Sequence, residues 1–416
     1  MSESGGGDIR LAAIRSGGRA IGRGGDGGAA GEELVAAPSL ASVRAFPDLD
    51  ALDAAMEADP RVYRRHGNAT VGMLETVLAV LETPAGGSAP LARATASGQA
   101  ALALLVSAAT MSGRRRVVLV RPCYGGLEAL LLGPLAALGV TTTVVDLPPP
   151  PAACDVGALV ADVMGRDVAL VVAEVVTNPL LGVVDIPAVV AAAHSEGALC
   201  VVDSTLATPF LFQPLAFGAD AVMHSLTKHL SGHSDVLGGV ALASVDCEIG
   251  DWLDAHCRSL GAVLSPFDAW LTLRGLRTAP LRVERGTATA ASLALALAGH
   301  PAVAAMHHPS LRVGDDAALA QRLLPLGGGP MLSIDVRGGR SAAGRVVRAL
   351  DGIRLAPSLG DVSTTVSHPV STSHRHLGAD ALAALGISDG LLRFSVGIED
   401  EPALRAELSA ALDAAG

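Results

Sequence analysis

Short apolar runs alternate with helical stretches from about residue 94 to residue 240. The runs are rich in Val, Leu and Ala on successive positions, as expected for strands buried on both faces of a sheet. The predicted strands are 116–120, 141–145, 168–173, 197–202 and 219–223. The segments 70–82, 156–164 and 187–194, and the stretch that opens at Ser97-Gly98, have the pattern of helices. Strand and helix alternation of this kind predicts an α/β fold with a mostly parallel sheet and flanking helices.

The pattern changes after residue 265. Residues 265–285 have helical periodicity with Pro280 as a breaker, and a further helix is predicted at about 285–298. Strands are predicted at 331–336 and 353–356, with a helix between them, and in 391–399. We therefore expect a smaller α+β C-terminal domain. The predicted division is a flexible, glycine-rich N-terminal arm (1–62), a large α/β domain (63–265) and the C-terminal domain (266–416).

Composition narrows the class of protein. A chain of 416 residues that is 50% apolar has ample core for two domains, although only 2% of its residues are aromatic. A net charge of -11 and scattered arginines argue against a nucleic-acid partner. No apolar run reaches membrane-spanning length, so no membrane partner is expected. The five cysteines are too dispersed for a disulfide framework, and we expect a cytoplasmic protein.

Lys228 is the single lysine of the chain, which otherwise uses arginine for its cations. Arginine stays protonated in proteins, whereas a lysine can lose its proton and form an imine with a carbonyl group. Composition drift could also leave one lysine, but the neighbouring residues favour a chemical role.

Polar side chains follow the two predicted strands that precede Lys228. Asp203 follows the strand 197–202, and Ser225, Thr227 and Lys228 follow the strand 219–223. Ligands of open α/β sheets bind at this carboxyl edge. A carboxylate, two hydroxyls and an amine suit pyridoxal 5'-phosphate. Asp203 would keep the pyridine nitrogen protonated, Ser225 and Thr227 would bind the phosphate, and Lys228 would form the imine.

Residues 203–239, DSTLATPFLFQPLAFGADAVMHSLTKHLSGHSDVLGG, resemble the lysine signature of the Cys/Met-metabolism pyridoxal-phosphate enzymes. This family contains cystathionine γ-synthase, cystathionine γ-lyase, methionine γ-lyase and the O-acylhomoserine sulfhydrylases. The resemblance implies the fold type I of pyridoxal-phosphate transferases, a pyridoxal 5'-phosphate cofactor and a small amino-acid substrate. It also implies a homotetramer built from dimers that share active sites.

Further residues match the family's motifs one by one. By resemblance, Tyr63 and Arg65 reach the cofactor phosphate of the neighbouring subunit, although His66 and Ala69 depart from the commonest residues there. The main-chain amides of Gly98 and Gln99 bind the phosphate, at a predicted helix N-terminus that favours anions. The remaining matches are Tyr124, which stacks on the cofactor and assists the leaving group, Asn178 near its phenolic oxygen, Ser358 of a Ser-Leu-Gly turn, and Arg393, which holds the substrate carboxylate.

The resemblance implies γ-replacement on an activated homoserine, through an imine on Lys228 and a vinylic intermediate. γ-Elimination is the alternative. We prefer replacement because Tyr124-Gly125-Gly126 lacks the cysteine typical of methionine γ-lyase. A specialised biosynthetic enzyme with an unusual nucleophile stays open, and so does a non-catalytic relative that binds the cofactor.

A metal site at His224, His229, His233 and Asp235 was the competing interpretation of the lysine loop. It is disfavoured because Ser231 and Gly232 interrupt a helix there and because it gives Lys228 no role. We therefore expect no metal.

Overall fold

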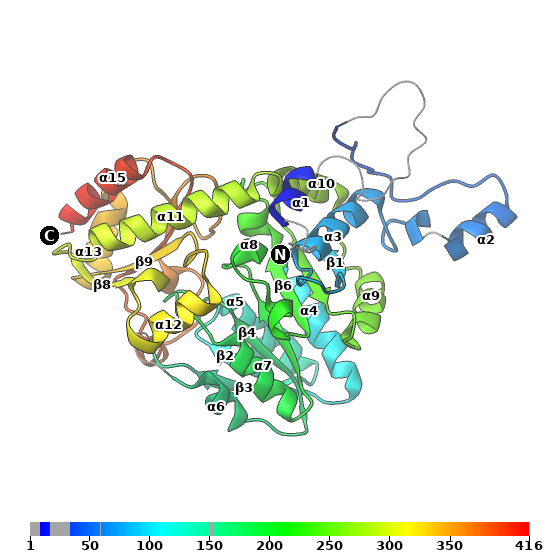
Figure 1. Ribbon diagram of the computed structural model, residues 1–416, viewed down its shortest axis with the longest axis horizontal. Helices are drawn as coiled ribbons and strands as arrows, with labels where there is room; N and C mark the ends of the chain where they lie inside the picture. The colour runs from blue at the N-terminus through cyan, green and yellow to red at the C-terminus, as the bar shows by residue number, and fades with distance from the viewer. Residues whose placement is uncertain (1–8, 17–33, 59, 150–153, 416) are drawn as a thin grey trace, which may run out of the picture.

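The structure is a computed structural model that describes residues 9–16, 34–58, 60–149 and 154–415. The prediction of a flexible glycine-rich segment falls on residues 1–8 and 17–33, which lie outside the described residues. Helix α2 (Leu49–Ala58) lies away from the rest of the protein in Figure 1. The stretch before it is bonded to the rest of the protein: the Ser39 amide donates to the Thr70 hydroxyl at 2.9 Å, and the Trp270 indole donates to the Ala36 carbonyl at 3.0 Å.

A seven-stranded sheet, counted over the described residues, forms the centre of the larger part (Figure 1). Its strand order is β1-β7-β6-β5-β4-β2-β3. The strands are β1 (Leu91–Thr95), β2 (Arg116–Arg121), β3 (Thr141–Asp146), β4 (Val168–Glu174), β5 (Leu199–Asp203), β6 (Ala221–Ser225) and β7 (Gly239–Ala243). The prediction of an α/β fold with a mostly parallel sheet is confirmed.

Strand β7 is antiparallel to both of its neighbours, β1 and β6. The sequence analysis missed it. Residues 226–238, which connect β6 to β7, contain only the π-helical turn Leu226–Leu230 and no crossover helix. A parallel return needs such a crossover, so β7 turns back along β6 instead.

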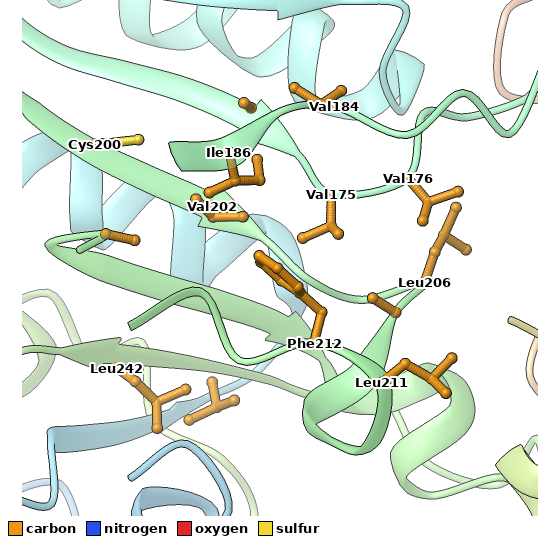
Figure 2. Close-up of a cluster of buried hydrophobic side chains, with 14 of the residues drawn as sticks. Val175, Val176, Val184, Ile186, Cys200, Val202, Leu206, Leu211, Phe212 and Leu242 are labelled. Atoms are coloured by element: carbon orange, nitrogen blue, oxygen red, sulfur yellow. The ribbon is translucent and has the colours of Figure 1, made fainter. Parts of the chain in front are cut away.

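Helices cover both faces of this sheet, which explains why its strands are apolar at successive positions. In β2, Val118 and Val120 pack with α3 (Ala69–Leu81) and α7 (Ile186–Ser195) on one face. Val117 and Leu119 pack with α4 (Gly98–Ala109), α5 (Gly125–Leu130) and α9 (Ile249–Leu260) on the other. Figure 2 shows part of the core on the α3 and α7 face of the sheet, where Val202 of β5 lies among aliphatic side chains and Phe212. The helices of this part are α1 (Ile9–Arg15), α3 (Ala69–Leu81), α4 (Gly98–Ala109), α5 (Gly125–Leu130), α6 (Val156–Ala161), α7 (Ile186–Ser195), α8 (Thr208–Leu211), α9 (Ile249–Leu260) and α10 (Pro266–Leu276).

A smaller five-stranded sheet, again counted over the described chain, has the order β10-β11-β12-β9-β8. Its strands are β8 (Val303–His307), β9 (Met331–Val336), β10 (Arg354–Leu355), β11 (Thr365–Ser367) and β12 (Leu391–Ser395). The helices are α11 (Ala279–Leu297), α12 (Gly314–Leu323), α13 (Gly339–Ala349), α14 (Ala379–Ala384) and α15 (Glu401–Asp413). The α+β character is as predicted, and the boundaries 63–265 and 266–416 stay a prediction.

Alternation along β12 decides how the small sheet meets the large one. Leu392 and Phe394 are buried in the small sheet's core with α11, α13 and α15. Successive side chains of a strand point to opposite faces, so Arg393 points toward the large part, where it bonds Asn178. The five residues of β12 (LLRFS) thus contribute two side chains to the core of the small sheet and one buried cation to its other face.

The break between the two helices was predicted at Pro280, but it lies a few residues earlier in the chain. Helix α10 ends at Leu276, and α11 begins at Ala279 with Pro280 in its first turn. A proline is accommodated there because the first amides of a helix have no intrahelical acceptor. Pro280 therefore begins a helix and does not end one.

Candidate active site

Three neighbouring strands end at one cavity of about 420 Å³. Glu174 ends β4, Asp203 ends β5 and Ser225 ends β6, and all three line the cavity. Strands β4 and β5 are parallel, with Glu174 directly paired to Asp203. The carboxyl edge of the sheet therefore carries the cavity, and its size fits a cofactor-sized ligand.

Lys228 lies in the π-helical turn Leu226–Leu230, which directly follows β6. Its backbone is not helical, with φ -103° and ψ -139°. The Lys228 Nζ donates a hydrogen bond of 3.0 Å to Ser358 Oγ. Burial, and then the positive charge of Arg393, lower the pKa of the Lys228 amine to about 8. A lysine in this state can supply a neutral amine near neutral pH.

Asp203 accepts a hydrogen bond of 2.9 Å from the amide of Thr205. Burial raises the pKa of this carboxyl, whereas the bonds from Thr205 oppose the rise. The Thr205 hydroxyl oxygen in turn accepts the amide of Ser225, at 2.9 Å. Thr205 therefore joins the ends of β5 and β6. The sequence places it at the end of a predicted strand but suggests no role for it.

Glu174 is a buried carboxyl that the sequence analysis also missed. It accepts the amide of Tyr124 at 2.8 Å and the amide of Asn178 at 3.1 Å. Burial, and then the charge of Asp203, raise its pKa well above the ordinary value. Its place as the last residue of a buried strand is the signal that identified Asp203 and that would have identified Glu174.

The N-terminus of α4 faces the end of β6. The Ser97 side chain caps this helix by accepting the amide of Ala100, so the earlier amides of Gly98 and Gln99 have no intrahelical acceptor. A Cβ on Gly98 would lie 3.2 Å from the Ser225 Cβ, which shows how closely the two segments approach. The Thr227 hydroxyl also lines the cavity and exchanges hydrogen bonds with Gly238.

Tyr124 lies at the start of α5, and its side chain lines the cavity while remaining 43% exposed. The Gln99 side chain donates a hydrogen bond of 2.5 Å to the carbonyl of Gly126. A Cβ on Gly126 would lie 2.5 Å from the Tyr124 ring. The structure therefore has no room for a side chain at residue 126 with the ring in this position.

Arg393 is 6% exposed and donates a hydrogen bond of 2.6 Å to the side-chain oxygen of Asn178. Among the described residues, its buried Nε has no partner. Burial lowers the pKa of the guanidinium to about 10, against the opposing charge of Glu174. An unsatisfied buried donor beside Lys228 and Ser358 suits an anionic ligand.

Tyr63 and Arg65 lie outside this cavity. Tyr63 forms an isolated bridge with Val43, and its side chain is 45% exposed. Arg65 lies over the Tyr63 ring and donates to the carbonyl of Arg258 at 2.7 Å. Their predicted role in a neighbouring subunit stays a prediction. The structure brings the other predicted residues together at one cavity: Gly98, Gln99, Tyr124, Asn178, Asp203, Ser225, Thr227, Lys228 and Arg393, with Ser358 bonded to Lys228.

The competing metal interpretation finds no geometric support in the described residues, where no group of three or more His, Cys, Asp or Glu side chains is placed to hold an ion. His224 bonds Glu82 at 2.6 Å, and His233 bonds the carbonyl of Ser231 at 2.7 Å.

Among the helices of the described residues, none combines the length and apolar character of a membrane span.

Comparisons with known proteins agree with this site. Residues 26–413 match the model of the Cys/Met metabolism PLP-dependent enzymes. An L-methionine gamma-lyase of Brevibacterium sandarakinum is 39% identical over 361 residues, which cover 86% of this chain and 84% of that protein. An O-succinylhomoserine sulfhydrylase of Pseudomonas aeruginosa is 37% identical over 360 residues, covering 86% and 85%. The crystal structure of a cystathionine gamma synthase from Xanthomonas oryzae pv. oryzae superimposes with a TM-score of 0.84 at 37% identity, and 98% of each chain is covered.

Proposed function

Because this chain belongs to the Cys/Met metabolism PLP-dependent enzymes, we propose that it catalyses γ-replacement on an activated homoserine-type amino acid. The observation that carries the proposal is the convergence of Lys228, Asp203 and Arg393 on one cavity. These residues supply an amine, a buried carboxylate and a buried cation within one ligand site.

The residues of the cavity fit pyridoxal 5'-phosphate, the cofactor of this family. In our proposal, the amides of Gly98 and Gln99, which have no acceptor within α4, and the hydroxyls of Ser225 and Thr227 would hold its phosphate. Asp203 pairs with the pyridine nitrogen, whose positive charge would offset the burial of that carboxyl. Asn178 would lie near the cofactor's phenolic oxygen, and Tyr124 would stack on its ring. The bound cofactor supplies an electron sink for the carbanion at the substrate's Cα.

The chain's own residues would bind the amino acid and move its protons. Arg393 binds the α-carboxylate, using donors that include its unpartnered Nε. The Lys228 amine, once neutral, takes the Cα proton and later returns protons, and Ser358 holds that amine in place. Tyr124, which lines the cavity, would assist departure of the γ-substituent.

γ-Elimination is the second candidate, and it is favoured by relatives named as methionine gamma-lyases. We prefer replacement because the residue after Tyr124-Gly125 is Gly126, where a side chain would meet the Tyr124 ring. A cysteine, typical of the lyase at that position, would therefore require the Tyr124 ring to lie elsewhere than it does here. A specialised biosynthetic enzyme with an unusual nucleophile, or a relative that binds the cofactor without turnover, would share the same cavity.

The test is a panel of substrates given to the purified enzyme. O-acetylhomoserine and O-succinylhomoserine are supplied with and without thiols, and cystathionine and methionine are supplied alone. Thiol-dependent formation of a thioether supports γ-replacement, whereas release of ammonia and a 2-oxo acid without thiol supports elimination. No turnover of any substrate, with the cofactor bound, would indicate a non-catalytic relative. Lys228→Ala should abolish every reaction, and full activity in that variant would overturn the assignment.

We also propose that the functional unit is a homotetramer built from dimers that share active sites, in the cytoplasm. Support comes from α2, which lies away from the large part in Figure 1. On this helix and in the stretch before it, the apolar side chains of Leu40, Val43, Leu49 and Met56 are exposed. Exposed apolar side chains in such number suit an interface between subunits. A neighbour would receive Tyr63 and Arg65 at its own phosphate site. Sedimentation that finds a fully active monomer would contradict this.

A further inference from the structure

Arg282, in the first turns of α11, is only 8% exposed, and its guanidinium donates hydrogen bonds mainly to main-chain carbonyls. Its Nε donates to the Thr278 hydroxyl at 3.1 Å. The other nitrogens donate to the carbonyls of His229 (2.7 Å), Gly275 (2.9 Å), Leu230 (3.3 Å) and Ser231 (3.4 Å). Burying a cation is costly, so a guanidinium fixed in this way is expected to have a structural purpose.

Three of those carbonyls belong to the residues that directly follow Lys228. They end the π-helical turn Leu226–Leu230, where carbonyls lack the donors of a continuing helix. Lys228 itself has non-helical backbone angles, so the regular hydrogen-bond pattern is interrupted at the reactive residue. The turn therefore depends on contacts from outside for its shape, and Arg282 supplies three of them.

Glycines allow the guanidinium to approach the turn. Gly232 has a positive φ of 74°, and a Cβ there would lie 1.9 Å from a terminal nitrogen of Arg282. A Cβ on Gly275 would lie 2.1 Å from the Ser231 carbonyl oxygen. Both segments are thus packed around Arg282 at distances that only glycine permits.

The C-terminal part contacts the same turn from another segment. A Cβ on Gly360 would lie 2.4 Å from the His229 amide nitrogen, and the Val362 amide donates to the Gly232 carbonyl at 2.9 Å. The hydroxyl of Ser358, two residues before Gly360, accepts a hydrogen bond from the Lys228 amine. The lysine turn is therefore held between the Arg282 guanidinium and the 358–362 segment.

We propose that Arg282 is a positioning residue for Lys228, which fixes the main chain of residues 229–231 so that the amine stays buried in the cavity against Ser358. Arg282 is not among the residues that line the cavity, so it acts through the turn and not on the substrate. The inference rests on the proposed function, in which Lys228 is the reactive amine.

The single lysine gives a direct test. The full-length chain is freed of bound pyridoxal phosphate with hydroxylamine and gel filtration, its loss is checked by visible absorbance, and the chain is then labelled with trace acetic anhydride over a range of pH. Mass spectrometry of the Lys228 peptide then reports the pKa of its amine without a signal from any other lysine. In Arg282→Met the turn loses its support and the amine becomes more exposed. Its pKa should rise by about one unit or more, from about 8 toward the ordinary 10.5.

Arg285→Gln is the matched control, because Arg285 lies on the same helix and makes an exposed bond to the Glu399 carbonyl at 3.2 Å. It should leave the Lys228 pKa unchanged. If Arg282→Met does not fold, Arg282→Lys keeps the cation and up to three donors, and should give a smaller rise in the same direction. Its added lysine lies in a different peptide.

A Lys228 pKa that is unchanged in the folded Arg282 variants would overturn the proposal, even if their activity or melting temperature falls. The measurement needs neither cofactor nor substrate. A wild-type enzyme without γ-replacement activity would therefore defeat the proposed function and leave this result standing.

Discussion

The Arg393 guanidinium donates a 2.6 Å hydrogen bond to the Asn178 side chain across 215 residues of sequence. Arg393 comes from β12 of the small sheet, and Asn178 from the loop after β4 of the large one. The main-chain amide of Asn178 donates a hydrogen bond to the Glu174 carboxyl, which also accepts one from the main-chain amide of Tyr124. One buried network therefore sets the positions of the residues proposed to bind the cofactor and the substrate carboxylate.

Replacing Arg393 with Ala should raise the KM for the amino acid, because the substrate carboxylate loses its charged partner. The expected loss of binding is about 2 kcal/mol or more, which corresponds to a rise of roughly thirtyfold. Steady-state kinetics measures it, and the visible absorbance of the bound cofactor checks that Lys228 still holds the cofactor. An unchanged KM would contradict the carboxylate role.

Covalent capture of pyridoxal phosphate should become faster as the pH rises through about 8, because the neutral Lys228 amine is the nucleophile and its pKa is lowered to that value. Below this pH the amine is mostly protonated, and about a tenth of it is neutral at pH 7. Stopped-flow absorbance measures the rate. Arg393→Ala should move the midpoint upward, since the Arg393 charge contributes to the lowering. A midpoint near the ordinary lysine value in the wild type would contradict this environment.

The sequence predicted the large sheet well because its strands are buried on both faces and stand out as apolar runs. It also located Asp203 and Lys228, since polar residues at the ends of such strands are conspicuous. It missed the two strands at the antiparallel edge, β1 and β7. The direction of β7 depends on the absence of a crossover helix. It also missed Glu174 and Arg282, whose roles depend on main-chain groups far away in sequence, such as the Tyr124 amide and the His229 carbonyl.

The buried pair of Glu82 and His224 should be important for stability. Their side chains are both 1% exposed and bond at 2.6 Å, and each has a second buried atom without a partner among the described residues. Removing one member, as in Glu82→Ala, should reduce the free energy of unfolding by about 3–5 kcal/mol. Denaturant unfolding measures it. Glu284→Gln, which breaks an exposed pair with Arg10, should cost under about 1 kcal/mol, and equal effects of the two variants would refute the prediction.

Gly125→Ala should damage the wall of the cavity that the small part of the protein provides. A Cβ on Gly125 would lie 1.8 Å from the main-chain oxygen of Ser373, and a backbone atom cannot rotate away. The segment that contains Thr372 and Ser373 lines the cavity beside Tyr124, so it must shift. We expect kcat/KM to fall by about tenfold to a hundredfold and stability to fall by about 1–3 kcal/mol.

Gly133→Ala is the control for that substitution, because a Cβ on Gly133 meets nothing within 4 Å. It should leave kcat/KM unchanged and stabilise the fold by up to about 1 kcal/mol, since alanine restricts the unfolded chain more than glycine does. Kinetics and thermal unfolding of the two variants are compared side by side. If Gly125→Ala were as active as Gly133→Ala, the position of the 372–373 segment would not matter for the substrate site, and this prediction would be refuted.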